Sequence, residues 1–207
     1  MLALWEILSV VTSCLVVEWV VFSFVGKSRW VAAVPVFLAV GFMFISHRER
    51  GETVRDLGFR TDNFLAACRW LLLPTALVVV LAVAASWFFN HSLFAAPWRN
   101  RFLFLPLWAL FQQYVLNGFI NRRAQLALGQ GPKSVLLVAL VFSVLHFPNP
   151  LLAVLTLIGG VIWAASYQRQ PNLFALALSH AVSSVILALT ISPNLLGSLR
   201  VGFKYFG

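Results

Sequence analysis

Three amide side chains lie close together late in one apolar stretch, at Gln112, Gln113 and Asn117. Two histidines, His146 and His180, occur in later apolar stretches. An amide inside hydrocarbon costs free energy unless it is paired, so such a cluster needs partners or water. We therefore predict that these five residues form one buried polar pocket, which the other helices of the chain enclose.

The spacing of these residues supports convergence. Each of three predicted helices carries two residues four apart, which places both on one helical face: Gln113 with Asn117, Phe142 with His146, and His180 with Ser184. With a rise of about 1.5 Å per residue, Gln112, His146 and His180 lie roughly 15, 18 and 12 Å along their helices. The three polar faces are therefore predicted to meet at a similar depth.

The spacing alone leaves more than one interpretation open. Polar side chains in membrane helices often hydrogen-bond between helices, with a gain of about 0.6 kcal/mol each. Two histidines at matching depth instead favour a functional site. A metal site is the weakest alternative, because two histidines are half of a zinc ligand shell and no carboxylate or thiol lies at a helpful spacing. We expect no metal and no other cofactor.

The composition places this site in a membrane protein. Of 207 residues, 61% are hydrophobic and only 10% are charged, and apolar runs recur at bilayer-spanning length. We predict an all-α polytopic transmembrane bundle that forms one domain over residues 1–207. The seven expected spans are 2–25, 30–46, 64–89, 102–120, 134–147, 151–167 and 172–191, and 193–207 is a tail or an eighth element.

The formal net charge of +9 comes from Lys and Arg that lie mainly between the spans. There they set topology and meet anionic lipid head groups, so we expect membrane lipid as a partner and no nucleic acid. Eight of these cations fall on one side of the seven spans and six on the other, which favours the first side, with the N-terminus, as cytoplasmic. Cys14 and Cys68 are each expected to be small buried hydrophobes.

A few single residues carry further expectations. Glu18 is an acid well inside a span, and it is a candidate base if the first span packs against the fourth; a structural role is the alternative. His47 and His91 are expected to be solvated loop residues, and Asn149, between two prolines, a turn residue. The pair Gly159-Gly160 is expected to permit close helix packing.

Three motifs in this order resemble the CPBP family, which comprises CAAX proteases and bacteriocin-processing (Abi) intramembrane proteases. They are QQYVLN from Gln112, FSVLH from Phe142 and HAVSS from His180. The stretches VRDLGF before the third span and HFPNP after the second motif are also similar to the family. The resemblance covers about residues 54–184.

The chain departs from the family pattern at the residues that matter most. Gln112 and Gln113 stand where the family has paired glutamates, Asn117 stands at its arginine and Ser184 at its asparagine. The resemblance implies that a glutamate and the first histidine activate water, and that the second histidine and the asparagine stabilise the oxyanion. A glutamine orients water but does not take its proton, so His146 is the remaining candidate base, with Gln112 or Gln113 as orienter.

The resemblance implies an intramembrane endopeptidase that acts on a membrane-anchored or lipidated peptide, in the inner membrane of a bacterium. The alternative is a pseudoprotease that keeps the pocket and binds such a peptide, or a partner protein, without cutting it. A transporter is the weakest hypothesis, because no inverted repeat is visible. The candidate site residues are Gln112, Gln113, Asn117, His146, His180 and Ser184.

Overall fold

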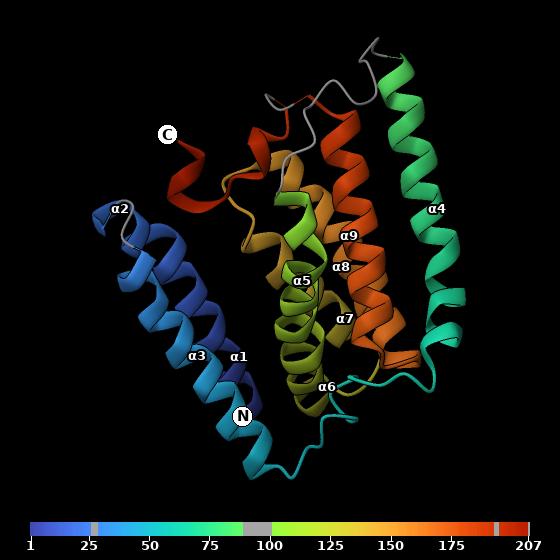
Figure 1. The fold of residues 1–207 in the computed structure, drawn as a ribbon. Helices are drawn as coiled ribbons and strands as arrows, with labels where there is room; N and C mark the ends of the chain where they lie inside the picture. The colour runs from blue at the N-terminus through green and yellow to red at the C-terminus, as the bar shows by residue number, and fades with distance from the viewer. Residues whose placement is uncertain (26–28, 89–100, 193–194, 207) are drawn as a thin grey trace.

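The computed structural model describes residues 1–25, 29–88, 101–192 and 195–206, and the regular elements in these ranges are all helical. The chain begins with Leu2–Leu15 (α1), Val16–Val21 (η1, a π-helical segment) and Phe22–Val25 (α2), which follow one another in one rod. Helix α3 (Arg29–Glu49) returns beside α1, and the two form a hairpin at one side of the molecule (Figure 1).

The other rods form the main body. They are Phe64–Phe88 (α4), the continuous run Arg101–Gln113 (α5), Tyr114–Asn121 (η2, π-helical) and Arg122–Leu128 (α6), then Pro132–Val144 (α7), Pro150–Arg169 (α8) and Leu173–Thr190 (α9). Helix α9 packs against both α4 and α5, and α7 packs against α8 (Figure 1). Two short 3₁₀ turns follow at Gly197–Leu199 (η3) and Gly202–Tyr205 (η4).

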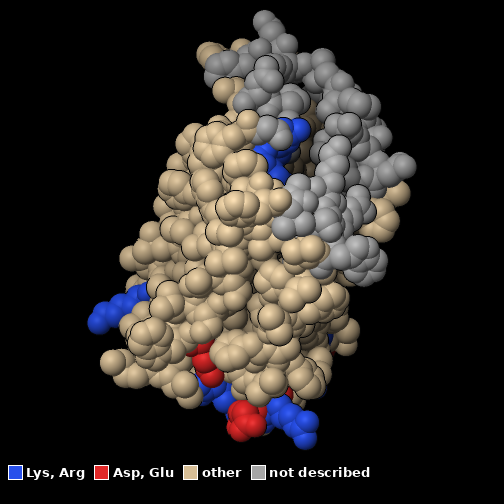
Figure 2. Space-filling view, turned by 90° about the vertical axis from the view of Figure 1, so that its left-hand side faces the viewer, with Lys and Arg blue, Asp and Glu red and all other residues tan. Residues whose placement is uncertain are grey.

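Five helical stretches among the described residues are long and apolar enough to cross a membrane: Leu2–Phe24, Phe64–Phe88, Leu103–Leu128, Pro150–Arg169 and Leu173–Thr190. Helix α7 is apolar but shorter, and α3 is not among the five. The all-α multi-pass bundle is therefore confirmed, whereas the count of seven spans stays a prediction. Figure 2 shows a broad, mostly uncharged face with charged residues at its lower end and a smaller patch of Lys or Arg near its upper end, a distribution typical of a protein that crosses a membrane.

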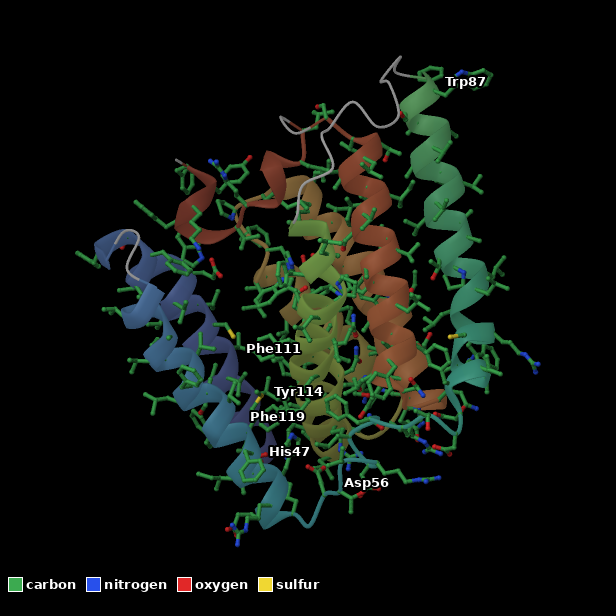
Figure 3. All side chains as sticks on the ribbon, viewed as in Figure 1. His47, Asp56, Trp87, Phe111, Tyr114 and Phe119 are labelled. Atoms are coloured by element: carbon green, nitrogen blue, oxygen red, sulfur yellow. The ribbon has the colours of Figure 1, made fainter. Side chains whose placement is uncertain are left out.

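Two details differ from the sequence-based expectation. The fifth span was expected to reach Phe147, but α7 ends at Val144, and His146 lies in the turn before Pro148. His47 was expected to be solvated; it is in the last turn of α3 and only 4% exposed, because it packs on Phe119 and Tyr114 (Figure 3). His91 lies outside the described residues.

Close packing at Gly160 agrees with the expectation. A Cβ atom at this position would lie 2.8 Å from the Cα of Ala139 on α7, so only glycine permits this approach of α7 and α8. At Gly159 the three nearest atoms to such a Cβ all belong to the ring of Trp163 on the same helix, and none belongs to α7.

Candidate functional site

A cavity of about 200 Å³ lies among α4, α5, α8 and α9. Four of the six candidate residues line it: Gln112, His146, His180 and Ser184. The rest of the lining is mainly apolar and includes Trp108, Leu155 and Leu187. The two histidines and one amide that the sequence placed at a common depth thus share one space.

The other two candidates, Gln113 and Asn117, lie behind the cavity wall. Both are fully buried, and neither lines the cavity. The Gln113 amide lies 3.2 Å from Nδ1 of His180, and Asn117 Nδ2 donates to Gln113 Oε1 at 2.6 Å. Gln113 and Asn117 therefore hold His180 and are not placed to touch a ligand, whereas Gln112 faces the cavity.

The turn after α7 orients His146. Its Nδ1 lies 2.6 Å from the carbonyl oxygen of Phe142, and a carbonyl only accepts, so Nδ1 carries the proton. The Nε2 atom of the neutral ring then has a free lone pair, and His146 lines the cavity. The Phe142 ring packs edge-on against both histidines, with centroids 4.7 Å from His146 and 5.9 Å from His180.

His180 has the opposite arrangement. The nitrogen of the Gln113 amide only donates, so Nδ1 of His180 accepts and Nε2 carries the proton. The ring also stacks on Trp163, whose centroid is 4.4 Å away, and Trp163 Nε1 donates to Ser179 Oγ at 3.1 Å. The cavity thus has one imidazole that accepts a proton and one that donates a hydrogen bond.

Gln112 and Ser184 are the other two candidates in the lining, which also contains the hydroxyl-bearing residues Thr75, Thr156, Ser179 and Ser183. Gln112 is half-buried, and its amide makes no hydrogen bond to another described residue. Its carbonyl and NH₂ groups are therefore left for water or a ligand. Ser184 lies four residues after His180 on the same helical face and also lines the cavity.

Glu18 lies elsewhere. It is in η1 against the C-terminal segment, where a Cβ at Gly202 would lie 2.8 Å from the Glu18 Cβ. Glu18 is not among the residues that line the cavity. No described residue of the lining is an acid, so the structure supplies no carboxylate in place of the two glutamines.

Some polar residues near the site escaped the sequence analysis. Asn121 and Gln168 extend the hydrogen-bonded row behind Gln113, and both are linked to it through Asn117. Asn121 lies four residues after Asn117 on the same helical face, so its spacing could have predicted that it extends the row. Gln168 comes from α8, and no spacing within one helix points to it.

Fold and site together define an integral multi-pass membrane protein with a polar site between its helices. Residues 94–186 match the family model described as type II CAAX prenyl endopeptidase Rce1-like. This match includes all six candidate residues and supports membership of the chain in the CPBP/CAAX protease family, as the resemblance predicted. No curated protein and no solved structure matches the chain.

Proposed function

We propose that this protein is a CAAX-type intramembrane endopeptidase in which His146 replaces a glutamate as the general base. The observation that carries the proposal is that His146 and His180 line the same cavity and that their Nδ1 contacts favour opposite tautomers. Nε2 therefore has a lone pair at His146 and an N–H at His180. The substrate is a membrane-anchored or lipidated peptide. Its apolar anchor or lipid would contact the mainly apolar side chains that line the cavity. The expected location is the inner membrane of a bacterium.

The reaction that suits these groups is hydrolysis of a peptide bond. His146 Nε2 takes a proton from water, which Gln112 orients, and the hydroxide attacks the carbonyl carbon. The carbonyl oxygen becomes an oxyanion and accepts hydrogen bonds from His180 Nε2–H and the Ser184 hydroxyl. His146 then gives its proton to the leaving nitrogen, so that the products are a carboxylate and an amine.

A cleavage assay in lipid tests this scheme. The purified chain in nanodiscs is mixed with membrane-anchored peptides, with and without a prenylated cysteine, and the products are identified by mass spectrometry. We expect cleavage by the native chain, about 10²–10⁴-fold slower in His146→Ala and about 10²–10³-fold slower in His180→Ala. Native activity that both variants retain would overturn the proposal.

Gln112→Glu separates this scheme from its alternative. A carboxylate at the cavity wall adds a second base, so we expect hydrolysis to become faster. Gln170→Glu is the matched control, because Gln170 does not line the cavity and its Oε1 accepts a hydrogen bond from Asn63, which a carboxylate retains. Its rate should equal the native rate.

A second candidate function is peptide binding without cleavage, which the absence of an acid among the described lining residues favours. In that case the native chain retains the peptide but yields no product. Cleavage then appears only in Gln112→Glu. Binding is measured with the same peptides by fluorescence polarisation in nanodiscs.

A further inference from the structure

Four buried or half-buried amides form a continuous row from α8 to His180. Gln168 Nε2 donates to Asn121 Oδ1 at 3.0 Å, and Asn121 Nδ2 donates to Asn117 Oδ1 at 2.9 Å. Asn117 Nδ2 donates to Gln113 Oε1 at 2.6 Å, and Gln113 contacts Nδ1 of His180. We call Gln168, Asn121, Asn117 and Gln113 the amide ladder.

The ladder has a fixed direction, because backbone groups hold its far end. The backbone N–H of Gly131 donates to Gln168 Oε1 at 2.9 Å, so the nitrogen of Gln168 must face Asn121. Asn121 Nδ2 also donates to the carbonyl oxygen of Ala164 at 3.2 Å, and a carbonyl cannot donate. These two contacts define which side-chain atom is the nitrogen in the amides of Gln168 and Asn121.

The orientation of the Gln168 and Asn121 amides determines the orientation of Asn117 and then of Gln113. Asn121, Asn117 and Gln113 are each 0% exposed, so a reversed amide would set donor against donor with no water to separate them. Each step therefore requires the next amide to point the same way. The last nitrogen, that of Gln113, faces Nδ1 of His180, which must be unprotonated.

We propose that the amide ladder is a positioning device that keeps the proton of His180 on Nε2, so that His180 always presents a donor to the cavity. The proposal rests on the proposed function for its use, since a donor at this place stabilises an oxyanion or orients a bound carbonyl. It assigns roles to Asn117, Asn121 and Gln168, none of which lines the cavity.

The ladder predicts an unexpected effect of restoring a glutamate at position 113. A carboxylate only accepts, so in Gln113→Glu it takes hydrogen bonds from Asn117 Nδ2 and from His180 Nδ1–H. The proton of His180 then moves to Nδ1, and Nε2 loses its donor. Asn117→Asp has the same effect through Gln113. The new carboxylate accepts a hydrogen bond from the Gln113 amide nitrogen, so the Gln113 oxygen faces His180 and accepts from its Nδ1–H.

Nitrogen NMR of the histidine side chains tests the ladder directly. Nanodiscs hold the full chain with ¹⁵N-labelled histidine at about pH 8, where a histidine of ordinary pKa, about 6.5, is neutral. The four histidines are assigned by single substitution, and a protonated ring nitrogen is recognised by its shift and its N–H correlations. We expect Nδ1 of His180 to be unprotonated in the native chain and protonated in both Gln113→Glu and Asn117→Asp.

Gln170→Glu is the matched control. Gln170 Oε1 accepts a hydrogen bond from Asn63, which a carboxylate retains, and the charge change is the same. Its His180 signal should equal the native one, and the signal of His146, whose Nδ1 bonds the Phe142 carbonyl, should not change in any of these variants. The unchanged His146 signal also shows that a variant has folded.

A native spectrum with a proton on His180 Nδ1 would overturn the proposal, as would an unchanged His180 signal in both ladder variants. Neither result depends on hydrolysis, so the ladder and the proposed function fail separately. If both hold, Gln113→Glu should lower the cleavage rate about 10²–10³-fold, although Gln112→Glu raises it.

Discussion

Asn149 has three hydrogen bonds that connect the turn before α8 to the C-terminal segment. Its Oδ1 accepts from the N–H of Leu152 at 3.1 Å and so caps α8. Its Nδ2 donates to the carbonyl oxygens of Leu196 at 2.7 Å and Arg200 at 3.2 Å. Since Leu199 of that segment lines the cavity, Asn149 links the turn that carries His146 to one wall of the site.

Two substitutions at Asn149 should separate these roles. Asn149→Ala loses the cap and the donor, and we expect it to lower the free energy of unfolding by about 2–4 kcal/mol. Asn149→Asp keeps the cap but leaves two carbonyls without a donor, so the loss should be about 1–3 kcal/mol. Thermal unfolding in lipid-detergent micelles measures both, and equal losses would contradict the separate contributions.

At this scale the sequence predicted which candidate residues share a helical face. Gln113 with Asn117 and His180 with Ser184 were predicted from a spacing of four, and each pair lies on one face. It failed for His47, because that buried position depends on Phe119, which is 72 residues away in the chain. It also did not divide the candidates between the cavity and the ladder, since that depends on how α5 is rotated against α9.

The contact between α7 and α8 places the turn that carries His146. Both helices approach closely at Gly160, where an added Cβ would lie 2.8 Å from the Ala139 Cα and 3.2 Å from its Cβ. Backbone cannot yield as a side chain can, so this contact tolerates no larger residue without a shift of one helix.

We expect Gly160→Ala to destabilise the protein by about 1–3 kcal/mol and to lower peptide binding or cleavage, because α7 is displaced with His146 at its end. Gly41→Ala is the control, since Gly41 lies in α3 with nothing within 4 Å of an added Cβ. That variant should be neutral or more stable by about 0.5–1 kcal/mol, because alanine favours the helix. Unfolding midpoints of both variants decide the matter, and a stable Gly160→Ala would show that the contact is loose.

The helices themselves were predictable because long apolar runs bounded by charged or proline-containing turns define them. Most predicted spans agree with the observed helices to within a few residues. The exceptions are at ends that tertiary contacts set. Helix α7 ends three residues early, and the rod that contains Gln113 continues past Ile120 to Leu128, because Asn121 and Arg123 are buried against other elements.

At the scale of the whole molecule, one buried ionic cluster joins the α1–α3 hairpin to the main body. Arg123 of α6 is 0% exposed, and its guanidinium lies within 3.0 Å of Glu6 on α1 and of Glu52 in the loop after α3. Ser46 and His47 of α3 contact the same guanidinium. Three segments far apart in the sequence, namely α1, residues 46–52 and α6, therefore meet at one cation.

Glu52 makes this cluster sensitive to acid. Burial opposes its ionisation, but hydrogen bonds with His47, Arg123 and Arg122 outweigh that effect and hold the pKa of Glu52 well below its ordinary value. A carboxylate whose pKa is lower in the folded state stabilises that state above its unfolded pKa, about 4.3 for glutamate. The stabilisation is lost as the pH falls below that value and approaches the pKa of the folded state.

We therefore expect the unfolding midpoint to fall steeply below about pH 4, and Glu52→Gln to be destabilised by about 3–5 kcal/mol at neutral pH. The loss arises because Arg123 keeps its buried charge while one of its two acidic partners is gone. Asp62→Asn is the control: Asp62 is 42% exposed and pairs with Arg55 and Arg60, so it should cost less than about 1 kcal/mol. Thermal unfolding in micelles across this pH range measures all three proteins. If Glu52→Gln were as stable as Asp62→Asn, or if its pH dependence equalled the native one, the hairpin would be held by apolar packing and not by this cluster.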